Sequence, residues 1–162
     1  MTGNQVRVIA LGSPHGGDDE VMLGVAEALE AAVGVEVIIA GRPGPGLVEL
    51  LAPAEVPVVL LDVVRSGSAA GTIHAMGLGE LRERGLASDP VSSHGFGPAE
   101  ALKLAEALGR PLPDGVFVGV EGEQFTIGAE PSSAVAAALP RVRARVAAAI
   151  ADLLGNQENQ RA

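Results

Sequence analysis

The stretch that decides the fold is VRVIALGSPHGGDDEVMLGVAEALE, which runs from Val6 to Glu30. Its first six residues are mostly apolar and rich in β-branched side chains, and they stop at Gly12, as is typical of a buried strand. Further along, Val21, Val25 and Leu29 recur at helical spacing and so share one face of a helix. A strand, a glycine-rich turn and a helix, in this order, begin a sheet of parallel strands.

The same alternation of short apolar runs and helical patterns continues along the chain. Strand-like runs cover residues 35–40, 56–64, 71–78 and 115–120, and helical patterns cover 47–52, 80–86, 97–109 and 132–154. This order predicts an α/β fold: one three-layer domain with a mostly parallel, twisted five-stranded sheet and helices on both faces. We expect the domain to span residues 1–154 and the polar residues 155–162 to form a frayed tail.

The composition restricts the possible partners and locations. The chain has 162 residues, of which 48% are hydrophobic, and a formal net charge of −9 without a dense basic patch. This argues against nucleic acid and against an anionic membrane as partners, and leaves cations or a basic protein region. There is no cysteine, so a thiolate metal site is excluded. The first residues resemble neither a signal peptide nor a membrane span, so a cytoplasmic location is the default expectation.

Side chains that can bind a metal ion occur at three separate places in the sequence. Asp18 and Asp19 come after the first strand, Asp62 closes the apolar run of residues 56–61, and His94 precedes the helix at residues 97–109. Parallel sheets bind ligands outside the carboxyl ends of their strands. If these segments share one rim, Asp19, Asp62 and His94 would surround a divalent ion such as zinc or nickel.

Each of these residues also has an ordinary explanation when it is taken alone. An aspartate at a helix start is a common cap, which is our preferred reading of Asp18, and Asp62 could simply begin a turn. A single histidine in a Gly/Ser loop, as at position 94, is more often solvated than a ligand. His15 lies in the first glycine-rich turn, where it could contact a metal or a substrate. His74 lies inside a strand pattern and is expected to be structural.

Four ordered motifs give the chain a family resemblance. They are LGSPHGGDDEVMLGVAEAL, then VVLLDVV with the strand GTIHAM, then SSHGFGPAEALKLAEAL, and finally VGVEGEQFTIG before an alanine-rich helix. In this set the chain resembles the hydrogenase maturation proteases, endopeptidases that trim the C-terminus of the large subunit of nickel–iron hydrogenases. The motifs cover nearly the whole chain in the family's order.

The resemblance implies roles for particular residues. The metal-contacting and catalytic positions of the family fall on Asp19, Asp62 and His94, with Asp18 beside them as a capping or supporting group and His15 nearby. The glycine-rich loop GRPGPG corresponds to a segment that the family places near the substrate. Its Gly41, Arg42, Gly44 and Gly46 are therefore expected to help receive the peptide.

The resemblance also implies the chemistry and the partner. The expected activity is that of a metal-dependent, aspartic-type endopeptidase acting on a nickel–iron hydrogenase large-subunit precursor. The nickel is carried by that substrate, and zinc or another divalent ion would bind in isolation. The ion would polarise the scissile carbonyl or supply hydroxide, and one carboxylate would serve as general base.

Two departures from the family pattern keep other functions open. Ser13 stands where the family usually has Asn, and Glu20, Val21 and Met22 stand where it often has Gly-x-Gly. One alternative is a metal-dependent hydrolase with its own bound ion and another substrate. The other is a non-catalytic homologue that binds a metal, a small anion or a protein.

Overall fold

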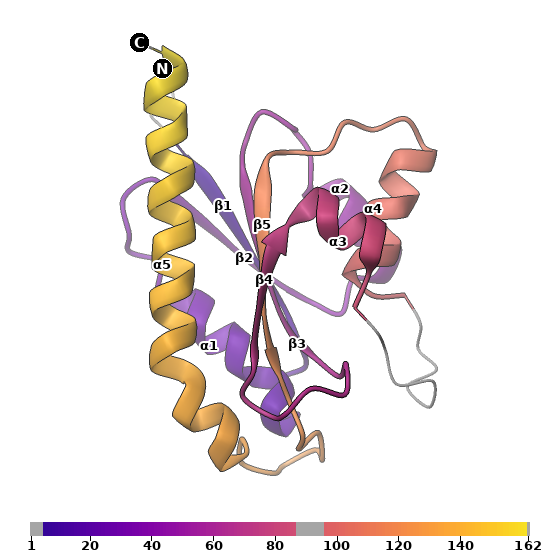
Figure 1. The fold of residues 1–162 in the computed structure, drawn as a ribbon, viewed down its shortest axis with the longest axis vertical. Coiled ribbons are helices and arrows are strands. Elements are labelled where there is room, and N and C mark those ends of the chain that lie inside the picture. The colour runs from indigo at the N-terminus through magenta and orange to yellow at the C-terminus, as the bar shows by residue number, and fades with distance from the viewer. Residues whose placement is uncertain (1–4, 87–95, 162) are drawn as a thin grey trace.

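The computed structural model describes residues 5–86 and 96–161, which form a five-stranded sheet with helices on both faces (Figure 1). The strands are β1 (Val6–Leu11), β2 (Val35–Gly41), β3 (Val58–Val64), β4 (Ile73–Gly77) and β5 (Gly115–Glu121). Their spatial order is β2-β1-β3-β5-β4, and every pair is parallel except β4–β5. The structure therefore confirms the predicted fold class, with the antiparallel β4 at one edge.

Two helical layers cover this sheet. The helices are α1 (Val21–Glu27), α2 (Leu47–Leu50), α3 (Leu78–Arg84), α4 (Pro98–Ala107) and α5 (Ser133–Arg161), with short 3-10 turns η1 (Gly17–Glu20) and η2 (Gly44–Gly46). α1 and α5 pack on one face of the sheet, and α2, α3 and α4 pack on the other (Figure 1). Every residue of the central strand β3 is buried, because helices cover it on both sides. Within the described residues, none of the helices combines the length and apolarity needed to cross a membrane.

The strand order creates a switch point at β1. The chain leaves β1 for β2 on one side, and then returns to place β3 on the other side of β1. The connection after β1 contains α1 and the connection after β2 contains α2, so the two connections lie on opposite faces. A crevice for a ligand is expected between such connections, at the carboxyl ends of the strands. The 3-10 turns η1 and η2 lie in these two connections.

The turn after β1 is closely packed. Gly12 has φ = 145°, and a Cβ atom at this position would lie 2.1 Å from the backbone oxygen of Asp19. Any larger residue would push η1 away from the end of the strand. The helical pattern of Val21, Val25 and Leu29 extends beyond the helix itself, since α1 follows η1 at Val21 and ends at Glu27.

The C-terminal helix is longer than the sequence indicates. α5 continues through the polar residues that we expected to be frayed and ends at Arg161. The Gln157 side chain accepts a hydrogen bond from the backbone N–H of Gln5 at 3.0 Å and donates one to its carbonyl at 2.8 Å. These two bonds connect the last turns of α5 to the start of β1, which explains why the helix does not end earlier.

Candidate active site

Asp19 lies in η1, directly beyond the carboxyl end of β1. Its side chain is only 10% exposed, and its Oδ2 accepts a hydrogen bond from the backbone N–H of Ser13 at 2.9 Å. A Cβ atom on Gly16 would lie 3.2 Å from the Cβ of Asp19, so this glycine leaves room for the side chain. The glycine-rich turn thus fixes one carboxylate at the switch point.

Asp62 brings a second carboxylate to the same place from β3. Its side chain is 5% exposed, and its Oδ1 accepts a hydrogen bond from the backbone N–H of Val63 at 2.8 Å. Burial raises the pKa of Asp62 to about 7; the charge of Asp19 adds to this effect, and the guanidinium of Arg42 opposes it. A carboxyl group with this pKa can both accept and return a proton near neutral pH.

Arg42 joins the two carboxylates. It follows β2 directly, and its Nη2 contacts Oδ1 of Asp19 while its Nη1 lies 3.4 Å from Oδ1 of Asp62. Both aspartates therefore converge on one cationic group. Carboxylate oxygens are also ligands for divalent ions, so the two side chains would fit a metal ion as well as this guanidinium.

The third predicted ligand, His94, lies outside the described residues. Among the residues that the structure describes, no group of three or more His, Cys, Asp and Glu side chains gathers closely enough to hold a metal ion. The structure thus brings Asp19 and Asp62 together, and the complete metal trio stays a prediction.

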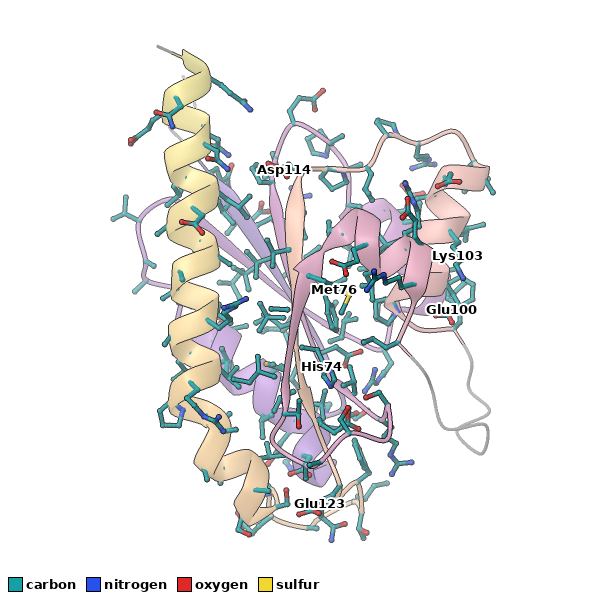
Figure 2. All side chains as sticks on the ribbon, viewed as in Figure 1. His74, Met76, Glu100, Lys103, Asp114 and Glu123 are labelled. Atoms are coloured by element: carbon teal, nitrogen blue, oxygen red, sulfur yellow. The ribbon has the colours of Figure 1, made fainter. Side chains whose placement is uncertain are left out.

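Asp18 does not have the capping role that we expected. It is fully buried, and no side-chain hydrogen bond from it caps its own turn. Its carboxylate instead accepts hydrogen bonds from the backbone N–H groups of Glu123, Gln124 and Ser132 and from the hydroxyl of Ser132, at 2.6–2.9 Å. Burial alone would raise the pKa of Asp18, but these hydrogen bonds outweigh it and lower the pKa below 3.8. Figure 2 shows Glu123 near the start of α5, so Asp18 anchors the segment between β5 and this helix.

The remaining predicted positions lie around this pair of carboxylates. His15 is an exposed residue with φ = 61°, and its backbone N–H donates to Oε2 of Glu20 at 3.0 Å. No hydrogen bond or ion pair within the described part of the chain links His15 to either active-site aspartate. Gly41 has φ = 64° and accepts a hydrogen bond from Gly12 at 3.0 Å, so the predicted substrate loop runs beside the first turn.

Gly44 and Gly46 lie further along that loop. Gly44 has φ = 56°, and Gly46, the last residue of η2, donates its backbone N–H to the carbonyl of Pro43 at 3.1 Å. The loop therefore contains one 3-10 turn where we expected only irregular structure. Contact of these residues with a peptide stays a prediction.

A buried cluster around Glu121 was missed by the sequence analysis. Glu121 ends β5, is 2% exposed and accepts hydrogen bonds from the backbone N–H and the hydroxyl of Ser66. The His74 Nε2 lies 3.0 Å from its Oε1, which fits the structural role expected for this histidine. In Figure 2, His74 and Met76 lie on β4, the edge strand beside β5. The sequence did contain a signal for this cluster, because Glu121 directly follows the apolar run GVFVGV at residues 115–120.

Comparison with known proteins finds a matching family model and similar solved structures. The family model described as "Hydrogenase maturation protease" matches residues 23–149, a span that includes Arg42 and Asp62 but begins after Asp19. The structure is similar to the hydrogenase maturating endopeptidase HybD from Escherichia coli, with a TM-score of 0.75, 23% identity and coverage of 91% of this chain and 93% of that one. It is also similar to the [NiFe] hydrogenase maturation protease HybD from Thermococcus kodakarensis, with a TM-score of 0.67, 21% identity and coverage of 90% and 99%. No curated protein matches the sequence.

Proposed function

Because the chain belongs to the hydrogenase maturation protease family, we propose that it removes the C-terminal extension of a nickel–iron hydrogenase large-subunit precursor after nickel has been inserted. The partner in this proposal is the precursor itself. Its nickel is part of the substrate and serves for recognition, and zinc or another divalent ion supplied in excess would occupy the same position in the isolated protein.

The convergence of Asp19 and Asp62 on one cation is the observation that carries this proposal. The two side chains come from separate segments, are almost completely buried and share a single guanidinium. Two buried carboxylates that share one site repel each other unless one of them is protonated or a cation lies between them. A presented metal with an open coordination position would satisfy the same requirement, with His94 as the proposed third contact.

The reaction requires an attacking water, a polarised carbonyl and a proton acceptor. Nickel on the substrate would supply Lewis acidity at the scissile carbonyl. We assign the proton transfer to Asp62, because burial in β3 favours its protonated form and so allows it to hold the proton taken from water. Asp62 would take a proton as the oxygen of water bonds to the carbonyl carbon, and return it to the amine nitrogen as the C–N bond breaks. Asp19 would hold the metal in position.

Cleavage of defined precursors tests this function. The purified protein is incubated with nickel-loaded and nickel-free forms of a large-subunit precursor from the same cell, and mass spectrometry follows loss of the C-terminal extension. We expect cutting of the loaded form only, and a rate at least about 100-fold lower for Asp62→Asn, since general-base catalysis contributes that much. Asp152→Asn, which changes an exposed aspartate on α5, is the matched control and should cut normally.

Two results would contradict the proposal. Equal cutting of both precursor forms would show that nickel is not needed for recognition. Normal cutting by Asp62→Asn would show that Asp62 takes no part in the reaction. Metal analysis of the purified protein adds a third measurement. A stoichiometric, tightly held ion would instead favour a hydrolase with its own resident metal.

A further inference from the structure

Arg42 differs from the other ion-paired arginines that the structure describes. Its two terminal nitrogens reach different carboxylates, those of Asp19 and Asp62. Each other arginine ion pair within the described residues joins a single carboxylate, as in Arg110–Glu49 at 3.1 Å. A planar guanidinium can bridge two acceptors in this way because its donors are fixed in a fork.

The exposure of the three side chains shows from which side Arg42 enters. The side chain of Arg42 is 47% exposed, whereas those of Asp19 and Asp62 are 10% and 5% exposed. The guanidinium therefore covers two buried carboxylates from the solvent side. Glycines with positive φ, Gly41 and Gly44, flank the segment that carries it. A half-exposed arginine regains water when it turns away, so its displacement does not require unfolding.

We propose that Arg42 is a tethered competitor for the cation position between Asp19 and Asp62, and that this competition weakens the binding of free metal ions to the site. A free ion at low concentration would not displace the guanidinium. A metal centre fixed in the precursor would, because the other contacts of that substrate hold it against the site. This last step rests on the proposed function, whereas the competition itself does not.

The affinity for nickel alone tests the competition. Ni²⁺ is titrated calorimetrically, at one pH and ionic strength, into the wild-type protein and into Arg42→Gln. We expect the variant to bind Ni²⁺ at least about 10-fold more tightly, which corresponds to roughly 1.4 kcal/mol. Arg110→Gln is the matched control, because Arg110 is 43% exposed and also ion-paired, and its substitution should leave the affinity unchanged.

A double variant shows whether the gained affinity belongs to this site. Arg42→Gln with Asp62→Asn should lose the gain, since one of the two carboxylates is then neutral. An affinity of Arg42→Gln no higher than that of the wild type would overturn the proposal. A gain that survives in the double variant would overturn it too, because the ion would then bind elsewhere.

A second substitution covers the case in which Arg42→Gln fails to fold, as judged by circular dichroism. Arg42→Lys keeps the positive charge but cannot bridge two carboxylates with a fork. We expect it to bind Ni²⁺ about 3-fold more tightly than the wild type, and no gain would count against the proposal. The failure of this inference can be told apart from the failure of the proposed function. If Arg42→Gln gains affinity but the wild type cuts no precursor, only the proposed function is refuted. If the wild type cuts the precursor but Arg42→Gln gains no affinity, only this inference is refuted.

Discussion

Asp62 is the residue at which folding and function conflict most clearly. Its neighbours in β3 are apolar and buried, so an apolar side chain would fit the pattern of this strand. Burial instead raises the pKa of Asp62 to about 7, which means that the folded protein disfavours the charged carboxylate. A buried group that costs stability is typical of a functional site.

Asp62→Asn is expected to stabilise the metal-free protein at pH 8. The folded pKa of about 7 lies above the ordinary value of 3.8, so Asp62 contributes stability at low pH that is lost as the pH rises toward and through 7. Urea unfolding should therefore show the wild type less stable at pH 8 than at pH 5, and the variant should lack most of this difference. Asp152→Asn should behave as the wild type; a variant as pH-dependent as the wild type would contradict the assignment.

Residue types and strand ends predicted where the carboxylates lie, but not what surrounds them. Asp19 and Asp62 could be selected because Asp19 lies in the turn after one apolar strand and Asp62 near the end of another. The bridge from Arg42 could not, since the direction of a long side chain depends on packing between distant segments. Asp18 was interpreted as a cap by a local rule, whereas its partners, such as Gln124, are 106 residues away in the sequence.

At the scale of elements, the strands were predicted well and the helix ends less well. The buried strands β1, β3 and β5 are mostly apolar runs, each with a single charged residue, and such runs are a strong signal for a buried strand. α1 ends several residues before its apolar pattern does, and α5 extends beyond its own. Tertiary contacts decide such ends, as the bonds between Gln157 and Gln5 illustrate.

Gln157→Ala should lower the free energy of unfolding by about 1 kcal/mol, because it removes two hydrogen bonds to the main chain of Gln5. Gln160→Ala is the matched control, since Gln160 is exposed on the same helix, and should change stability by less than about 0.5 kcal/mol. Urea denaturation measures both, and hydrogen exchange should show earlier loss of protection at Gln5 in the first variant only. Equal effects of the two substitutions would show that α5 does not depend on this contact.

At the scale of the whole molecule, two buried carboxylates hold the rim of the sheet around the candidate site. Asp18 connects η1 to the segment that leads into α5, and Glu121 connects the end of β5 to Ser66 after β3 and to His74 on β4. These contacts join segments that are far apart in sequence. The position of the aspartate pair therefore depends on a network that lies beside it and takes no part in the proposed reaction.

This network predicts a loss of stability in acid. Burial alone would raise the pKa of Asp18 and Glu121, but hydrogen bonds from Ser132 and Ser66 and their neighbours lower both below the ordinary values of 3.8 and 4.5. Their contribution is therefore complete above those values and is lost as the pH falls through the lower, folded pKa. Unfolding free energies measured from pH 6 to pH 2 should decrease steadily below about pH 4.

Asp18→Asn separates this effect from general acid denaturation. At pH 7 it should cost about 2 kcal/mol, because an amide nitrogen cannot accept the hydrogen bonds that the second carboxylate oxygen receives. Its stability should also fall less between pH 5 and pH 2 than that of the wild type, since the group that titrates is gone. Asp114→Asn removes an exposed carboxylate at the opposite end of β5 (Figure 2) and should leave both values unchanged. If Asp18→Asn loses stability in acid as steeply as the wild type, protonation of Asp18 does not cause the loss. Glu121 would then have to account for it alone.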